Sequence, residues 1–318
     1  MLASVVSANC SPRISRNCDN KTVSDLSRRS RLEPPAKAER RFGVSTHLFQ
    51  EHPLTRDHLV HIAAHGFEAV ELFATRAHFD YHDDRARAQL AEWLSDTRLE
   101  LHSVHAPAFA ALRQGKWVGA FSNASSDDAR RRAAIAEAEA ALAIARHAPF
   151  RFLVTHIGVP TSDALGSDNQ RDAARRSVEA LVALAAQVNV RVAIEVIPNP
   201  LSSASDLRDM IEEGLDGLDV GVCLDYGHAH LMGDLGEAIE TLSGHLLTTH
   251  VHDNGGRRDD HLVPFSGSIN WDEAMMSTQK IGYEGIFMLE VGDTGDPVDV
   301  LRRSVKARER LEQTFVTF

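Results

Sequence analysis

The sequence predicts an α/β protein in which eight parallel strands close into a barrel surrounded by helices. Two observations carry this prediction: eight short apolar runs recur along the chain, and longer stretches with helical spacing separate them. The runs are continuously apolar, as strands buried on both faces of a parallel sheet should be. The first run is not followed by the glycine-rich phosphate turn that an open, doubly wound sheet normally shows. We therefore expect a single (β/α)8 TIM barrel.

The expected strands are, in chain order, residues 42–45, 69–73, 99–104, 152–155, 191–196, 220–224, 246–251 and 285–291. Helical patterns lie between them, most clearly over residues 127–147 and 168–188, where apolar side chains repeat at helical spacing. Ser125 or Ser126 is expected to cap the first of these helices, and Ser205 the helix after the fifth strand.

The first 40 residues show no sustained helical or strand period. They are rich in Ser, Arg and Asn, and Pro34 and Pro35 close the segment. We expect residues 1–40 to form a disordered tail and residues 41–318 to form the barrel. The first 18 residues lack acids, which is a feature of transit peptides, but a plain tail or an over-long start is the favoured interpretation.

Composition narrows the class of protein. No apolar run approaches the roughly 20 residues of a membrane span. Two of the three cysteines lie in the N-terminal segment and one lies inside an apolar run, which is no disulfide framework and favours the cytoplasm. The sequence leaves self-association into a homo-oligomer open.

Charge is unevenly distributed along the chain. Residues 1–41 hold nine Lys/Arg and four Asp/Glu, which gives this segment a net charge of +5. Because the whole chain has a net charge of −11, residues 42–318 have a net charge of −16. A nucleic-acid-binding body needs Lys and Arg for phosphate contacts, so this charge disfavours a nucleic-acid partner. Acidic surfaces also occur in proteins simply because they aid solubility.

Polar side chains that bind metals stand at the ends of six expected strands. They are His105, His156, Glu195, Asp225, His250 and Glu290. The carboxyl ends of barrel strands converge on one mouth. Burying Glu195 and Glu290 there without partners would cost several kcal/mol each, and a shared metal removes that objection.

The sequence therefore predicts one divalent cation held by Glu195, Asp225, His250 and Glu290, and no organic cofactor. Carboxylate and imidazole together suit Zn²⁺, Mn²⁺ or Co²⁺, and Mg²⁺ stays open if water completes its shell.

The order of motifs in the carboxyl half resembles a known superfamily. After Glu195 come Asp225-x-x-His228, His250-x-x-Asp253, Asp259-x-His261, the segment Gly267-Ser268-Ile269-Asn270-Trp271, and finally Glu290. Over about residues 42–318 the chain resembles the xylose isomerase-like TIM barrel superfamily. Its members include sugar isomerases, ketose 3-epimerases, inosose dehydratases and endonuclease IV.

Resemblance to the isomerase and epimerase branch implies that Glu195 and Glu290 also exchange protons with a small carbohydrate. A proton α to a carbonyl is weakly acidic, so its removal needs a base and a cation that stabilises the enediolate. Two carboxylates on opposite sides of a ketose would invert a centre, whereas one base on one face would move the proton between neighbouring carbons. The expected substrate contacts are His228, His105, His156, Arg257 and His261.

Resemblance to the endonuclease branch implies three zinc ions and nine ligands instead. The five further ligands would be His105, His156, His228, Asp259 and His261. The acidic body and the lack of a dense basic and aromatic cluster in the mouth loops favour sugar chemistry, although Arg257 and Arg258 suit a phosphate. A sugar or inosose dehydratase remains a further alternative. Phe109 and Trp117 suit either an apolar wall for a sugar or ordinary packing.

Overall fold

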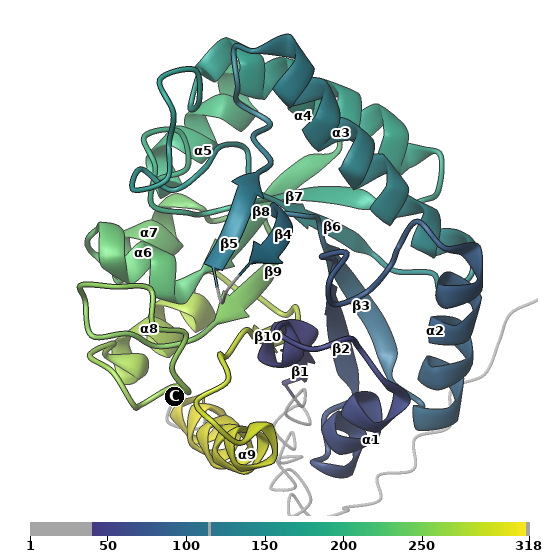
Figure 1. The fold of residues 1–318 in the computed structure, drawn as a ribbon. Helices are drawn as coiled ribbons and strands as arrows, with labels where there is room; N and C mark the ends of the chain where they lie inside the picture. Colours follow the sequence, from purple (N-terminus) through teal and green to yellow (C-terminus); the bar gives the residue numbers. More distant parts are fainter. Residues whose placement is uncertain (1–39, 114–115, 316–318) are drawn as a thin grey trace, which may run out of the picture. The chain divides into compact units, whose positions relative to one another are not determined.

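A computed structural model describes residues 40–113 and 116–315, and over these the chain folds into a closed barrel of eight parallel strands (Figure 1). The hydrogen-bonded order around the barrel is β1-β10-β9-β8-β7-β6-β3-β2. The predicted barrel is therefore confirmed. The predicted disorder of residues 1–40 falls almost wholly outside the described residues.

The strands lie where the apolar runs predicted them, to within two residues at each end. Their bounds are β1 Phe42–Ser45, β2 Ala69–Phe73, β3 Glu100–His105, β6 Phe152–Thr155, β7 Arg191–Glu195, β8 Val220–Asp225, β9 Leu246–Val251 and β10 Phe287–Leu289. The register of β8 and β9 sets Asp225 beside His250, so the strand ends share one level of the barrel.

Helices alternate with the strands and cover the outside of the barrel, as Figure 1 shows. They are α1 Arg56–Ala64, α2 Asp84–Thr97, α3 Asp128–Leu142, α4 Arg171–Ala186, α5 Ala204–Asp209, α6 Tyr226–Met232, α7 Leu235–Thr241, α8 Trp271–Lys280 and α9 Pro297–Thr314. Shorter turns are the 3₁₀ helices η1 Thr46–Phe49 and η2 Ala143–Arg146, and the π-helical η3 Met210–Gly214. Among the described residues no helix is long and apolar enough to cross a membrane.

Two helix caps differ from the prediction by one or two residues. Asp127 caps α3, because its Oδ1 accepts from the backbone of Ala129 and Arg130. Ser203, rather than Ser205, caps α5 by accepting from the Asp206 backbone. A carboxylate is as good a cap as a hydroxyl, so the choice depends on which residue begins the helix.

An antiparallel hairpin, which the sequence did not predict, follows β3. It consists of β4 Phe109–Arg113 and β5 Lys116–Ala120, and it forms a separate two-stranded sheet. Phe109 and Trp117 stack with their ring centroids 5.9 Å apart, and both line the pocket at the mouth of the barrel. The hairpin therefore supplies one wall of that pocket.

The barrel interior changes from apolar to polar along its axis. Successive side chains of a strand point to opposite faces, so alternate residues enter the barrel. Val154, Ala193 and Cys223 pack together there, fully buried. Two residues further along β7 and β8 stand Glu195 and Asp225, so polar groups occupy the next layer toward the mouth.

Candidate metal centre

Four side chains from neighbouring strand ends form a group that we call the inner centre. It consists of Glu195, Asp225, His250 and Glu290, whose ligand atoms all lie within 4.8 Å of one another. Nδ1 of His250 lies 3.0 Å from Glu195, 3.3 Å from Glu290 and 3.9 Å from Asp225. None of the four is more than 3% exposed.

A second group shares Glu195 with the inner centre. Nε2 of His105 and Nε2 of His156 each lie 3.1 Å from Oε2 of Glu195, whereas Oε1 of Glu195 faces His250. Nδ1 of His105 lies 2.7 Å from the Ala106 carbonyl, which can only accept a hydrogen bond. That contact keeps a proton on Nδ1, so Nε2 is the nitrogen that could bind a substrate or a cation in place of its contact with Glu195.

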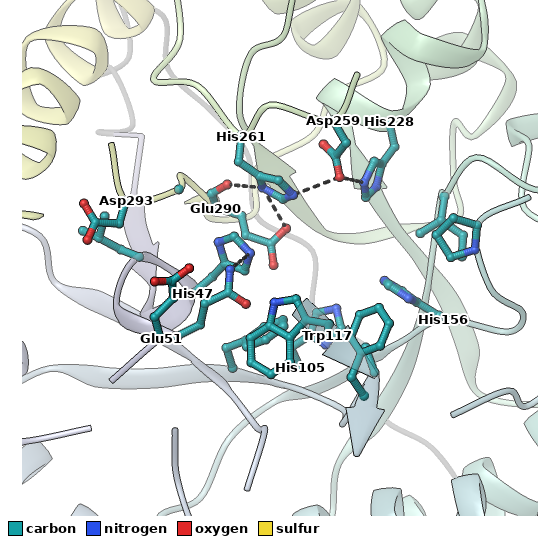
Figure 2. Close-up of a pocket in the computed structure, with 18 of the residues that line it drawn as sticks. His47, Glu51, His105, Trp117, His156, His228, Asp259, His261, Glu290 and Asp293 are labelled. Atoms are coloured by element: carbon teal, nitrogen blue, oxygen red, sulfur yellow. Dashed lines mark hydrogen bonds and ion pairs between the residues drawn. The ribbon is translucent and has the colours of Figure 1, made fainter. Parts of the chain in front are cut away.

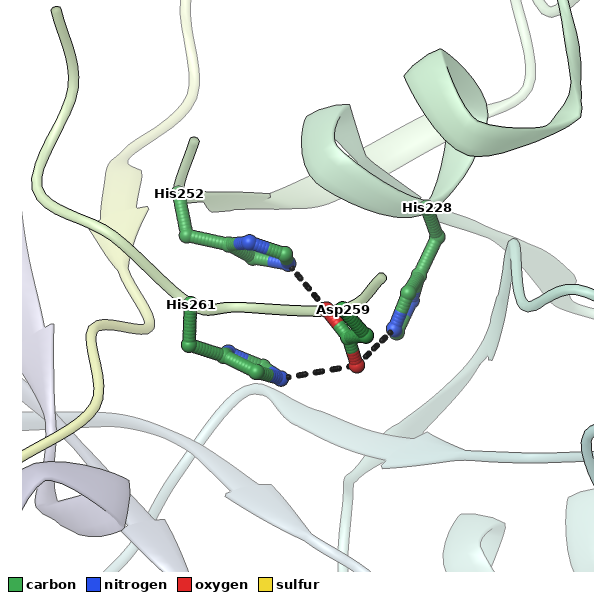
Figure 3. Close-up of side chains that lie close together, drawn as sticks. All are labelled: His228, His252, Asp259 and His261. Atoms are coloured by element: carbon green, nitrogen blue, oxygen red, sulfur yellow. Dashed lines mark hydrogen bonds and ion pairs between the residues drawn. The ribbon is translucent and has the colours of Figure 1, made fainter. Parts of the chain in front are cut away.

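A third group, which we call the outer group, contains His228, His252, Asp259 and His261 (Figure 3). Oδ2 of Asp259 lies 3.0 Å from Nε2 of His228 and 3.1 Å from Nε2 of His261. His252 stacks on His261 with ring centroids 4.0 Å apart, and its Nε2 lies 3.0 Å from Asp225. His252 thus joins the outer group to the inner centre.

The Asp-x-Gly-His motif has a local structural reason. Asp225 is the N-cap of α6, and its Oδ1 accepts from the His228 backbone at 2.7 Å. A Cβ on Gly227 would stand only 2.0 Å from Cε1 of His252. Only glycine therefore lets α6 begin at Asp225 with His252 packed against it.

Asp253 positions the loop that carries Asp259 and His261. It is fully buried, and it accepts hydrogen bonds from Nε1 of Trp271 at 2.9 Å and from the Ile269 backbone at 3.2 Å. These contacts give Asp253 a structural role that needs no cation.

The charges of the inner centre are not balanced by its own residues. Burial raises the pKa of Glu290 to about 7, and the neighbouring Glu195 adds to this although His250 opposes it. Burial would also raise the pKa of Glu195, but His250 and His156 lower it well below its usual range. Burial would lower the pKa of His250, yet the surrounding acids raise it well above 6.5. Three carboxylates facing one imidazole suit a divalent cation.

The outer group, unlike the inner centre, has no excess of carboxylates over imidazoles. Burial alone would raise the pKa of Asp259, but His261 and His228 lower it. Burial opposes ionisation of His261, yet Asp259 raises the pKa of His261 to about 9. One carboxylate thus faces two protonated imidazoles, so the outer group holds no excess negative charge that would attract a cation. The Asp259 side chain stays 37% exposed.

A pocket of about 400 Å³ opens above these groups, and Figure 2 shows its walls. Seven of the predicted site residues line it, namely His105, His156, Glu195, His228, Asp259, His261 and Glu290. Asp225 and His250 are fully buried and do not line it, and Arg257 is exposed outside the lining. The described residues that line the pocket include no Lys or Arg.

Three residues of the site were missed by the sequence analysis. His252 lies two residues after His250, and alternation along the strand was the signal that could have found it. His47 follows β1 at the mouth and stacks on His261 with centroids 4.5 Å apart. Glu71 is the single charge in the apolar run of β2, and it contacts His250.

Comparison with known proteins gives the family. The sequence matches the family model described as xylose isomerase-like TIM barrel over residues 59–311, which is most of the chain. The chain belongs to this family. The resemblance predicted from its motifs is thereby confirmed.

The chain is also similar to individual proteins. The chain is 25% identical over 307 residues to the uncharacterized protein MJ1311 of Methanocaldococcus jannaschii, covering 91% of this chain and 100% of that one. A D-tagatose 3-epimerase-like protein superposes with a TM-score of 0.70 at 24% identity, covering 86% of this chain and 97% of that one. The IOLI protein with a bound zinc atom superposes with a TM-score of 0.69 at 16% identity, covering 87% of this chain and 100% of that one. At these identities the likeness shows the fold.

Proposed function

We propose that the protein is a metal-dependent carbohydrate isomerase or epimerase that transfers a proton α to a carbonyl. One observation carries the proposal: Glu195 and Glu290 line the same pocket, and both lie within 3.3 Å of Nδ1 of His250 in the inner centre. Two carboxylates beside one cation site are what removal and return of an α-proton require.

The two carboxylates differ in how readily they hold a proton. The pKa of Glu195 lies well below its usual range, so Glu195 is ionised and suited to remove a proton. The pKa of Glu290 is about 7, so Glu290 can deliver a proton and take one back. Pairs of acids whose environments separate their pKa values commonly divide the roles of acid and base. When bound, a divalent cation would stabilise the negative charge that develops on the carbonyl oxygen.

The pocket walls suit an uncharged polyol. His105, His156 and His228 offer ring nitrogens for hydroxyl groups, and Phe109 with Trp117 offers an apolar face for the carbons of a sugar. No Lys or Arg among the described lining residues is available to a phosphate. We therefore favour an unphosphorylated carbohydrate as substrate.

The structural neighbours support the reaction class. They include a D-psicose 3-epimerase crystallised with D-tagatose and an L-ribulose 3-epimerase, with TM-scores of 0.67 and 0.65 at 18% and 15% identity. A third neighbour is a 3-keto-D-glucoside 4-epimerase, with a TM-score of 0.67 at 15% identity. These activities belong to those proteins, and their shared chemistry is proton transfer beside a carbonyl.

A second candidate is a hydrolase that uses three zinc ions on a phosphodiester such as abasic DNA. The observation in its favour is that all three groups satisfy the distances for metal ligation. Two properties oppose it: the outer group has only one carboxylate, which already pairs with two imidazoles, and the acidic body repels DNA. Dehydration, in which an acid assists loss of a neighbouring hydroxyl, would use the same two glutamates.

Exchange of the α-proton with solvent tests the proposal. The Mn²⁺-loaded protein is incubated in D₂O with unphosphorylated ketoses, including D-fructose and D-tagatose, and deuterium at the α-carbons is measured by NMR. We expect exchange by the wild type, abolished by Glu290→Gln and retained by Glu240→Gln, a surface carboxylate paired with Lys280. Exchange retained by Glu290→Gln would exclude Glu290 as an essential acid or base.

A further inference from the structure

Glu71 is a fully buried carboxylate that no catalytic step proposed above uses. It lies in β2, two residues before Phe73 and therefore on the same face of the strand. Phe73 lines the pocket, whereas Glu71 does not. Glu71 thus occupies the interior layer directly beneath the ligand-bearing strand ends.

The contacts of Glu71 point to one histidine. Its Oε2 lies 3.0 Å from Nε2 of His250 and accepts a hydrogen bond from Oγ of Ser103 at 2.8 Å. Its Oε1 is buried, with no hydrogen-bond partner among the described residues. Burying a carboxylate in this way is costly, and an apolar side chain of similar volume would fill the barrel more cheaply. The contact with His250 is therefore the reason that we infer for a carboxylate at this position.

The two ring nitrogens of His250 face opposite groups. Nδ1 points to Glu195 and Glu290, and Nε2 points to Glu71. A carboxylate can only accept a hydrogen bond, so it retains a proton on Nε2. Without a cation, Nδ1 also holds a proton toward Glu195 and Glu290, and this is the proton that a cation would displace.

We propose that Glu71 is a positioning residue, which fixes the Nε2-protonated tautomer and the ring orientation of His250 so that Nδ1 can ligate a cation in the inner centre. The proposal rests on the metal-dependent function proposed above. Ser103 holds the Glu71 carboxylate in place from the adjacent strand, because β2 and β3 pair Glu71 with Ser103. Partners of this kind typically contribute a 10–100-fold effect on metal affinity.

The test compares Glu71→Gln with the wild type by Mn²⁺ affinity, measured by electron paramagnetic resonance on the full chain. The amide keeps the volume and one acceptor, and it removes one negative charge from a centre in which three further carboxylates still face His250, so the metal-free protein should melt at the wild-type temperature or higher. We expect Mn²⁺ affinity to fall by about 10–100-fold. Nitrogen NMR of the protein loaded with diamagnetic Zn²⁺ should show a protected His250 Nε2–H in the wild type and its loss or weakening in the variant.

Asp168→Asn is the matched control, because Asp168 is also a buried carboxylate but pairs with Arg130 outside the site, at 3.1 Å. We expect it to lower the melting temperature and to leave Mn²⁺ affinity unchanged. Should Glu71→Gln fail to fold, Ser103→Ala supplies the second test, since a loosened Glu71 should weaken Mn²⁺ binding by several-fold. Wild-type affinity in the folded Glu71 or Ser103 variant overturns the proposal. Failure of the wild type to bind Mn²⁺ would instead overturn the metal-dependent function itself.

Discussion

Replacing Gly227 by alanine should disturb the metal centre, although Gly227 itself is not a ligand, because the new methyl group would push against His252. The added Cβ would lie 2.0 Å from Cε1 and 2.4 Å from Nδ1 of His252. The ring must retreat by about 1.5 Å to reach the roughly 3.5 Å separation of two carbons in contact. His261 is stacked on His252 at 4.0 Å, so the displacement is passed to the outer group.

Two energies follow from this geometry. Overpacking lowers the free energy of unfolding by about 1–3 kcal/mol. Alanine in a helix raises it by about 1 kcal/mol relative to glycine. A net loss of about 1 kcal/mol should lower the melting temperature by about 3 °C. Moving His252 also breaks its 3.0 Å contact with Asp225, and loss of such an outer partner should weaken Mn²⁺ binding by about 10–100-fold.

The assay is Mn²⁺ titration and thermal unfolding of Gly227→Ala beside Gly236→Ala. Both glycines are the second residue of a seven-residue helix capped by aspartate, Asp225 for α6 and Asp234 for α7. A Cβ on Gly236 would have its nearest neighbour at 3.3 Å, so this control should keep wild-type affinity and melt no lower. Equal affinity and equal melting temperature for the two variants would refute the reasoning.

Two further predictions concern protons and the loop after β9. In the metal-free protein at neutral pH, His250 is charged and Glu290, with a pKa of about 7, is partly protonated, so cation binding must displace protons. Calorimetry in buffers of different ionisation enthalpy should show proton release, and affinity should rise from about pH 6 to about pH 8; binding without release would contradict this. Trp271→Phe removes the donor to buried Asp253 and should lower the free energy of unfolding by about 1.5–3 kcal/mol in urea. An unchanged unfolding midpoint would show that the Asp253 contact does not stabilise the loop.

Much of the fold could be predicted because short apolar runs and helical spacing are visible in the local sequence. The run Val220–Asp225 is apolar on both faces, which predicts a buried parallel strand. It ends in a carboxylate, which predicts that this end of the strand lies at the mouth of the barrel. The hairpin of Phe109–Arg113 and Lys116–Ala120 could not be predicted in this way. Its two segments have only five residues each, and they lack the clear alternation of apolar and polar residues that marks a half-buried strand.

The site was predictable only as far as strand ends reveal it. The structure brings Glu195, Asp225, His250 and Glu290 together as that rule expected, and their roles stay predictions. Glu71 was missed because it lies within its strand, one layer below the mouth. Which oxygen faces which imidazole depends on the register between strands, and a single sequence does not contain that information.

The number of cations that each chain retains tests the central claim most directly. Protein loaded with Zn²⁺ or Mn²⁺ is dialysed and its metal is counted by plasma mass spectrometry, with Asp225→Asn as the matched variant because asparagine still caps α6. We expect one tightly held equivalent of metal per chain in the wild type and its loss in Asp225→Asn. Three retained zinc equivalents with cleavage of abasic DNA, or none retained by the wild type, would contradict it.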